Sequence, residues 1–328
     1  MREIGRLATL HQPAARQPTK WAPRTTSFPH ASSAKPWYTL GMTDTTPILV
    51  TGATGNVGGA LTELLAAAGH PVRAAGRSAR DLPQGVAFSR LDFLDPTTYA
   101  STLEGVRRVF LIRPPAISDV RRELGPFLNA MERAGVTHVV FLSLLGVERN
   151  RIVPHRAIED LLRASRMDWT MLRAGFFMQN LSTTHRDEIR DLAEIIVPAG
   201  HGRTSFVDVR DLAEVAALAL TEPGHRGKAY PLSGAVALDY AEVAATMSAV
   251  LGRPISYRQP SLLRFVRHWL AKGAKPAYIA VMAVLYTTAR LGLAATVTPD
   301  LTRLLARPPR TLRTFVEDNR HAWDATAA

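Results

Sequence analysis

The sequence predicts an α/β fold: a doubly wound parallel sheet followed by a smaller mixed, mainly helical unit. Short apolar strands alternate with helix-length segments from residue 47 onward, which is typical of βαβ units. A glycine-rich turn joins the first expected strand to the first expected helix at residues 51–58. The 328 residues, 46% hydrophobic and 21% charged, suffice for one α/β core and a second, smaller unit.

Six strands are expected in the first half of the chain. They are residues 48–50, 72–76, 86–91, 108–112, 138–143 and 169–173. The helices expected between them are residues 56–68, a segment from about 96, 124–134 and 154–165. Gly69 and Gly135 provide helix stops, and Pro154 suits a first helical position because that position needs no N–H donor. Residues 47–175 are therefore assigned to the core.

The pattern becomes mixed after residue 175. Short strands are expected near 194–197, 229–232 and 255–257, and helices near 209–220, 240–251, 262–271 and 276–289. Residues 176–328 are therefore assigned to a smaller substrate-side unit that contributes some elements back to the core. The apolar run at 277–286 is shorter than the roughly 20 residues that a membrane-spanning helix needs.

Residues 1–46 are expected to be a disordered tail. Five prolines interrupt any periodicity in the first 41 residues. Met42 stands just before the first strand, so an over-long start is the simpler explanation and an Arg-containing transit peptide is the alternative. The segment lacks the apolar stretch of a secretory signal, and we expect a cytoplasmic protein.

Composition excludes several classes of chemistry. The chain has no cysteine, which excludes disulfides, thiolate nucleophiles and iron–sulfur clusters. The net charge of +12 is concentrated at residues 1–41 and at residues 253–313, which hold eleven basic residues and one acid. Most of the basic residues are arginines, and no nucleic-acid-binding motif accompanies them, so a nucleic-acid partner is disfavoured.

The glycine-rich turn has the spacing Gly52-x-x-Gly55-x-x-Gly58, a variant of the dinucleotide-binding pattern. Gly52 permits the tight turn, Gly55 lets the backbone approach a pyrophosphate, and Gly58 lets the helix pack on the sheet. Free N–H groups at the helix start would then meet the anion. Its place in the first βαβ unit favours a Rossmann-type NAD(P) site over a purely structural turn.

The end of the second expected strand indicates which dinucleotide is bound. NAD-specific sites place an acid there for the ribose 2′-hydroxyl, whereas this chain has Gly76-Arg77-Ser78. An arginine and a hydroxyl can hold a 2′-phosphate, so we expect NADP(H) to be preferred over NAD(H). The alternative is that Arg77 is an ordinary solvated arginine.

Several familiar catalytic arrangements are absent from the sequence. None of the seven tyrosines is followed by lysine four residues later, and no lysine lies between Lys35 and Lys228. The Tyr-x-x-x-Lys pair of many short-chain reductases is therefore missing. There is also no HExxH or other metal-binding spacing and no Gly-x-Ser-x-Gly turn, so no metal site or hydrolase activity is expected.

Several further segments accompany the glycine turn and Arg77 in a characteristic order. They are LDFLD at 91–95, Pro114-Pro115, FLS at 141–143, PHRAIEDLL at 154–162, WTMLRAGFFMQN at 169–180, FVDVRD at 206–211 and RPPRTL at 307–312. With these segments, the chain from about residue 47 to 323 resembles the NmrA-like atypical short-chain dehydrogenase/reductases, and within them the NADPH:quinone oxidoreductase-like branch.

The resemblance implies a set of coenzyme-binding residues. They are Gly52, Thr54, Gly55, Asn56 and Val57 for the pyrophosphate, Arg77 and Ser78 for the 2′-phosphate, Asp92 and Phe93 at the adenine, Ile112, Arg113, Pro114, Ser143, Leu144 and Leu145 along the nicotinamide ribose, and Phe176 near the nicotinamide.

His155 and Ser143 are the candidate catalytic residues. The resemblance places His155 where the isoflavone-reductase branch has a lysine, whereas quinone-reductase members have histidine there. An imidazole that titrates near neutrality can donate a proton to a reduced quinone oxygen. The alternatives are a structural histidine at a helix start and, for Ser143, a ribose contact or a simple strand-end hydroxyl.

The segment 262–272 predicts an amphipathic basic helix. Phe265, Trp269 and Leu270 share one face with Leu262 and Val266, and basic residues lie largely elsewhere. Such a helix with an interfacial tryptophan is compatible with peripheral contact with anionic lipid, and the alternative is packing on its own domain. Either a monomer or a homodimer is expected.

Two hypotheses for function follow. The first is an NAD(P)H-dependent oxidoreductase that reduces a small apolar quinone-like or enone acceptor by hydride transfer. The second is a non-catalytic NADP(H)-binding redox sensor that acts on a protein partner, as the NmrA-type resemblance also implies. The missing tyrosine–lysine pair favours the second, and an apolar C-terminal unit suited to a ligand favours the first.

Overall fold

The computed structural model describes residues 45–79, 82–150 and 153–324. The expectations for a disordered tail and an over-long start therefore fall almost wholly outside the described residues. Within the described part, no helix is both long and apolar enough to cross a membrane.

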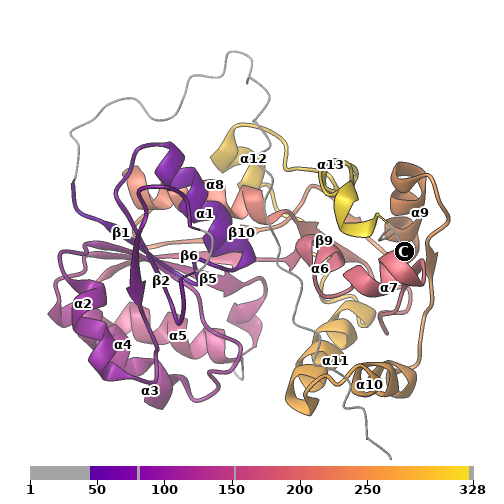
Figure 1. The fold of residues 1–328 in the computed structure, drawn as a ribbon, viewed down its shortest axis with the longest axis horizontal. Helices are drawn as coiled ribbons and strands as arrows, with labels where there is room; N and C mark the ends of the chain where they lie inside the picture. The colour runs from indigo at the N-terminus through magenta and orange to yellow at the C-terminus, as the bar shows by residue number, and fades with distance from the viewer. Residues whose placement is uncertain (1–44, 80–81, 151–152, 325–328) are drawn as a thin grey trace, which may run out of the picture. The chain divides into compact units, whose positions relative to one another are not determined.

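A seven-stranded parallel sheet forms the centre of the fold (Figure 1). The strands are β1 (Ile48–Thr51), β2 (Val72–Gly76), β3 (Ala87–Arg90), β4 (Arg108–Leu111), β5 (His138–Leu144), β6 (Asp168–Ala174) and β10 (Lys228–Leu232). Their order is β10-β6-β5-β4-β1-β2-β3, so the direction of winding reverses between β1 and β4. In open α/β sheets of this kind, ligands bind at the carboxyl ends of the strands beside that reversal.

Helices cover both faces of the sheet (Figure 1). One face carries α1 (Asn56–Ala67) and α8 (Val209–Thr221), which share a buried cluster with β1 and β4. The other face carries α2 (Tyr99–Leu103), α3 (Val120–Glu123), α4 (Gly125–Arg133) and α5 (Pro154–Ala164). Because both faces are covered, the central strands are buried along their length, which explains the continuous apolar runs in the sequence.

Most elements after β6 build a second hydrophobic core. Its small strands are β7 (Phe176–Phe177), β8 (Glu194–Ile195), β9 (Thr204–Val207), β11 (Ala237–Leu238) and β12 (Ser256–Tyr257). The helices after β6, α8 apart, are α6 (Gln179–Ser182), α7 (Arg186–Asp191), α9 (Tyr240–Leu251), α10 (Leu262–Ala271), α11 (Pro276–Arg290), α12 (Asp300–Leu305) and α13 (Leu312–Asp318). Short 3-10 helices lie at Pro96–Thr98, Val147–Arg149 and Arg320–Trp323.

Two elements from the second half of the chain complete the sheet-forming core. β10 pairs with β6 as the seventh strand, and α8 packs against α1 on the sheet face. The C-terminal segment is fastened to α8 as well, since Arg307 and Arg310 both donate hydrogen bonds to the buried carboxylate of Asp211. The core therefore draws on residues well beyond 175.

The face of α10 that carries Trp269 is buried. Phe265 is fully buried and Trp269 is 6% exposed, and both rings pack among the aromatic side chains of the second core. The alternative given for this helix, packing on its own domain, is therefore confirmed for the face that holds Trp269, and this tryptophan is not interfacial.

Candidate functional site

The turn between β1 and α1 is held tightly by its glycines. Gly52 has φ +64°, a conformation that residues with a Cβ rarely adopt, and its carbonyl accepts a hydrogen bond from Gly55 N at 2.9 Å. A Cβ on Gly58 would lie 2.3 Å from the Gly52 oxygen. Helix α1 can therefore start close beneath the turn only because position 58 is glycine.

The start of α1 presents backbone N–H groups to solvent. No side chain of the described residues caps the helix, and its first turn contains no acidic residue. Gly52, Thr54, Gly55 and Asn56 are exposed, whereas the side chain of Val57 is buried, so only the backbone of Val57 can take part. Exposed amides at the positive end of a helix dipole are suited to a phosphate group, and this geometry fits a dinucleotide pyrophosphate.

Thr51 connects β1 to β4, the two strands between which the direction of winding reverses. Its buried hydroxyl donates to Phe110 O at 3.0 Å and accepts from Ile112 N at 2.9 Å. A Cβ on Gly52 would touch the Ile112 side chain at 3.4 Å. The hydroxyl therefore fixes the end of β4 beside the glycine turn, a role that the sequence analysis did not identify.

The residues expected at the adenosine end lie after β2 and β3. Arg77 and Ser78 are exposed, and Arg77 has no ion pair with any acid in the described ranges. Asp92 is half-buried, and its carboxylate accepts from Leu94 N at 3.0 Å. The ring of Phe93 packs edge-on against Phe127 in the core, so its backbone rather than its ring is available to border an adenine.

Ser143 is bound to a buried carboxylate. Its hydroxyl, on β5, donates to Glu159 Oε1 at 2.6 Å, and both side chains are essentially inaccessible to solvent. Glu159, on α5, also accepts from Arg173 Nη2 at 2.8 Å and Arg163 Nη2 at 2.7 Å. The Ser143 hydroxyl is therefore part of a network that joins β5, α5 and β6.

The charge of Glu159 is stabilised by these donors. Burial pushes the pKa of this carboxyl upward, but the hydrogen bonds from Arg173, Ser143 and Arg163 outweigh burial and hold the pKa below its ordinary value. Glu159 is thus a buried anion at neutral pH. Its partners fix the carboxyl end of β5, from which the backbone continues into Leu144 and the half-buried Leu145.

His155 lies one turn before Glu159 on α5. Its ring stacks on Phe141 at a centroid distance of 5.9 Å, and its buried Nδ1 has no hydrogen-bond partner within residues 45–79, 82–150 and 153–324. Burial, reinforced by the Arg113 charge, lowers the pKa of His155 to about 3. The expectation of an imidazole that titrates near neutrality is therefore wrong, because the charged form would be poorly solvated at this position.

Arg113 follows β4, and its positive charge contributes to the lowered pKa of His155. Its Nη1 donates to the carbonyls of Pro114 at 3.0 Å and Pro115 at 3.2 Å, which stabilises the loop after the strand. Its Nε is buried without a hydrogen-bond partner in the described part of the chain, and burial lowers the pKa of the guanidinium. Arg113 and His155 thus each present one unsatisfied polar atom in the same region.

Phe176 is the residue expected near the nicotinamide. It belongs to β7, where it pairs in parallel register with Phe206 of β9, and it is half-buried. Main-chain hydrogen bonds hold the neighbouring segments together, from Gly175 N to Leu232 O and from Leu145 N to Ala174 O, each at 2.9 Å. β7 and β9 are short and were not predicted from the sequence.

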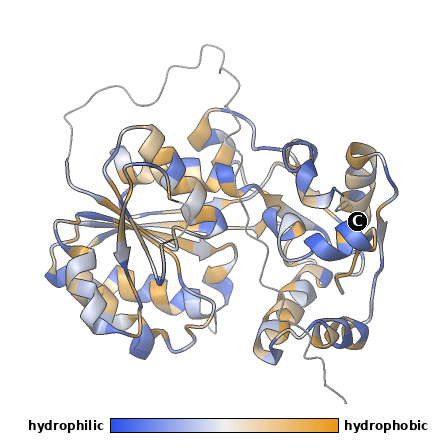
Figure 2. Cartoon of the chain, viewed as in Figure 1, coloured by the Kyte–Doolittle hydropathy of each residue, from blue (hydrophilic) through white to orange (hydrophobic). Residues whose placement is uncertain are grey.

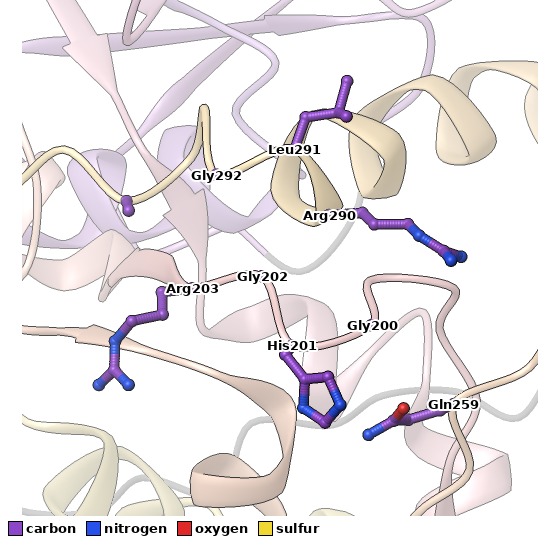
Figure 3. Close-up of a pocket in the computed structure, with 9 residues that line it drawn as sticks. Gly200, His201, Gly202, Arg203, Gln259, Arg290, Leu291 and Gly292 are labelled. Carbon is purple, nitrogen blue, oxygen red and sulfur yellow. The ribbon is translucent and has the colours of Figure 1, made fainter.

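A separate pocket of about 680 Å³ lies at the start of β9 (Figure 3). Its polar lining comes from His201, Arg203, Gln259 and Arg290, and its remaining lining from Gly200, Gly202, Leu291, Gly292 and Ala295. It shares no lining residue with the glycine turn or with the His155 region. This pocket is therefore distinct from the expected coenzyme site.

Sequence reasoning missed the side chains that support the site rather than line it. Thr51 and Glu159 lie inside segments already singled out, but neither has a spacing that predicts its partner. The available signal for Glu159 was weak: an acid on one face of a helix, with Arg163 four residues later. Arg173 completes the network only because β6 lies beside β5.

Comparison with known proteins agrees with this geometry. Residues 44–313 match the NmrA-like family. The NAD(P)H azoreductase of Xenophilus azovorans is 34% identical over 288 residues, covering 85% of this chain and 99% of that protein. Quinone oxidoreductase 2 of Escherichia coli is 26% identical, covering 81% of this chain and 96% of its own length.

Solved structures show the same relationship. Triphenylmethane reductase of Citrobacter sp., complexed with NADP(H), superposes with a TM-score of 0.74 at 25% identity, covering 83% of this chain and 99% of that one. The E. coli quinone oxidoreductase complexed with NADPH gives a TM-score of 0.73 at 25% identity, with coverage of 84% and 100%. The fold and the turn are those of a Rossmann-type NAD(P)-binding oxidoreductase. The chain belongs to the NmrA-like family.

Proposed function

We propose that this protein is an NADPH-dependent reductase of a small, flat, apolar acceptor of the quinone or enone type. The observation that carries the proposal is the glycine turn, where Gly58 allows α1 to begin beneath the Gly52 carbonyl and leaves uncapped amides exposed. The family supports it, because it includes proteins named as NAD(P)H azoreductase and quinone oxidoreductase.

In this proposal, the chain holds the coenzyme from two sides. The exposed backbone of residues 52–57 binds the pyrophosphate, and Arg77 with Ser78 binds the 2′-phosphate that distinguishes NADP(H). Asp92 and Phe93 border the adenine, and Ile112, Pro114, Leu144 and Leu145 line the path toward Phe176. When bound, the reduced nicotinamide supplies hydride to the acceptor.

The His155 region then binds the acceptor rather than protonating it directly. A neutral imidazole can donate its N–H or accept through its lone pair. Neither Nδ1 of His155 nor Nε of Arg113 has a hydrogen-bond partner among the described residues, and the Arg113 charge acts on His155. We propose that these atoms orient the oxygen of the acceptor, and that water supplies the proton. Ser143 and Glu159 act as positioning residues, since their hydrogen bond fixes β5 against α5.

A non-catalytic redox sensor is the second candidate. The depressed pKa of His155 removes the expected proton donor, and the Ser143 hydroxyl is engaged by Glu159. These observations on the two candidate catalytic residues favour binding without turnover. In that case the same site holds NADP(H), and the readout is a change in the affinity for a protein partner.

The test combines binding with turnover. Calorimetric titration with NADPH and NADH should give saturable binding with NADPH the tighter ligand, and NADPH oxidation should be stimulated by members of a quinone and enone panel. Tight binding without turnover on any acceptor would instead support the sensor. Absence of saturable binding of both coenzymes would contradict both candidates.

A further inference from the structure

Exposed apolar side chains gather on one part of the second core. Of fourteen exposed large hydrophobic residues in the described ranges, ten lie between residues 262 and 297. We call them the hairpin face, because α10 and α11 carry most of them. They are Leu262, Leu263, Leu270, Tyr278, Val281, Val284, Leu285, Leu291, Leu293 and Val297.

The hairpin face is additional to the surface that packs α11 into the core. That helix already buries Ile279, Met282, Tyr286 and Ala289, which lie three or four residues apart on one side. Tyr278, Val281, Val284 and Leu285 occupy the remaining circumference and are 40–64% exposed. Figure 2 accordingly shows apolar residues along most of α11. A helix that is apolar on all sides requires an apolar environment on the side that does not face its own core.

A buried ion cluster holds α10 in place below this face. Glu188 on α7 is 2% exposed and accepts hydrogen bonds from His268 Nε2 and Lys272 Nζ, both at 2.8 Å. Lys272 also lies 5.1 Å from the centre of the Trp269 ring. These contacts attach α10 to α7, and on the attached helix Leu263 and Leu270 are 63% and 49% exposed.

The segment that carries the hairpin face is uniformly positive. Residues 243–299 contain no Asp or Glu and seven Lys or Arg residues. Arg264 and Arg267 on α10, Lys275 before α11 and Arg290 at its end are all exposed. Two acids of α7 act on Lys272: Glu188 is buried and paired with it, and Asp191 is paired with Arg190.

We infer that the hairpin face is a docking surface for an anionic membrane, on which the protein lies peripherally. Apolar side chains ringed by cations suit the boundary between acyl chains and anionic headgroups. The charge disfavours the two other candidate occupants. Residues 1–41 carry a net charge of +5, and a second copy would bring an equally basic face, so both would be repelled.

This surface also adjoins the pocket of Figure 3, because Leu291 belongs to both. The inference goes beyond the proposed reductase activity and does not depend on it. Loss of coenzyme binding would leave it intact, and absence of lipid binding would leave the reductase proposal intact.

Vesicle flotation of the full chain tests the inference. We expect flotation with vesicles of phosphatidylcholine and phosphatidylglycerol, little with phosphatidylcholine alone, and a decline as salt is raised. The double variant Val281→Asp/Val284→Asp and the double variant Arg264→Glu/Arg267→Glu should each lower the partition coefficient at least about tenfold.

Matched variants elsewhere on the surface serve as controls. Val236→Asp changes an exposed valine outside the hairpin face, and Arg121→Glu reverses an exposed arginine on α3. Both should float like the parent chain, and circular dichroism should report unchanged folding in all variants. No flotation, or flotation that neither double variant weakens, overturns the inference. So does a dimer in sedimentation that Val281→Asp/Val284→Asp converts to monomer, since a second copy would then occupy the face.

Discussion

The hydroxyl of Ser143 on β5 donates a hydrogen bond of 2.6 Å to Glu159 on α5, and both side chains are buried. The same carboxylate is held by Arg163 and by Arg173, whose side chain is only 15% exposed. A strand, a helix and a neighbouring strand are therefore joined at one anion. The carboxyl end of β5, where the expected site lies, derives its rigidity from this junction.

Removing either side of the junction should have unequal effects. Ser143→Ala deletes one of several donors and should lower the free energy of unfolding by about 1–2 kcal/mol. Glu159→Gln leaves Arg173 and Arg163 facing a neutral group and should lower it by about 3–5 kcal/mol. Urea unfolding followed by circular dichroism measures both.

Measurements of turnover distinguish a positioning role for Ser143 from direct participation in the reaction. A positioning role predicts that Ser143→Ala changes kcat less than about tenfold and leaves coenzyme affinity nearly intact. A fall in kcat of about a hundredfold or more in a fully folded variant would instead assign Ser143 to the reacting groups.

The pH dependence of turnover should lack a contribution from His155. Because burial and Arg113 lower the pKa of this imidazole to about 3, it stays neutral across the whole range from pH 5 to pH 8. The pH profiles of kcat for the parent chain and for His155→Gln should therefore have the same shape, although the variant should be slower. An inflection near pH 6.5 that disappears in the variant would contradict this assignment.

Two adjacent glycines provide a matched test of the turn. A Cβ at position 58 would lie 2.3 Å from the Gly52 oxygen, whereas a Cβ at position 59 would lie 3.4 Å from the Ala53 oxygen. Gly58→Ala should therefore displace the turn and weaken coenzyme binding at least about tenfold. Gly59→Ala should bind normally and gain up to about 1 kcal/mol from helix propensity. Equal coenzyme affinities in the two variants would argue against a cradle formed by the turn.

Arg77 should determine the preference between the two coenzymes. It is exposed after β2 without an ion pair to a described acid, so its guanidinium is available to a 2′-phosphate. Arg77→Ala should weaken NADPH binding about tenfold and leave NADH binding unchanged. Arg121→Ala, at another exposed arginine, serves as the control in the same calorimetric titration. Equal weakening of both coenzymes would remove the proposed selectivity.

Stability should fall in mild acid because of buried neutral histidines. Burial lowers the pKa of His185 to about 4, below its ordinary value near 6.5. Above pH 6.5 the folded and unfolded states both hold it neutral. Between pH 6.5 and 4 only the unfolded state takes up the proton, so the free energy of unfolding drops by up to about 1.4 kcal/mol per pH unit.

His185→Gln measures the share of that loss due to one residue. The variant should be less stable than the parent at pH 7, because the hydrogen bond to Tyr286 is weakened, but its stability should depend less steeply on pH. His201→Gln, at an exposed histidine, should leave the slope unchanged. Identical slopes for all three proteins would contradict the buried neutral state of His185.

Local sequence patterns were sufficient for the sheet and most long helices. The expected segment 72–76 coincides with β2, and 240–251 and 262–271 coincide with α9 and α10. These elements have strong periodicity and clear boundaries. The two-residue strands β7 and β11 were missed, since such short pairings depend on which segments the fold brings alongside and have no periodicity of their own.

The glycine turn, the arginine after the second strand and the αβ alternation could be predicted from the sequence, because each is a local pattern of residue types. The hydrogen bond from Ser143 to Glu159, the neutral state of His155 and the burial of Trp269 became evident only in the folded chain. Those properties depend on desolvation and on partners distant in the chain. Desolvation and these hydrogen bonds contribute free energy only once the strands and helices have packed together.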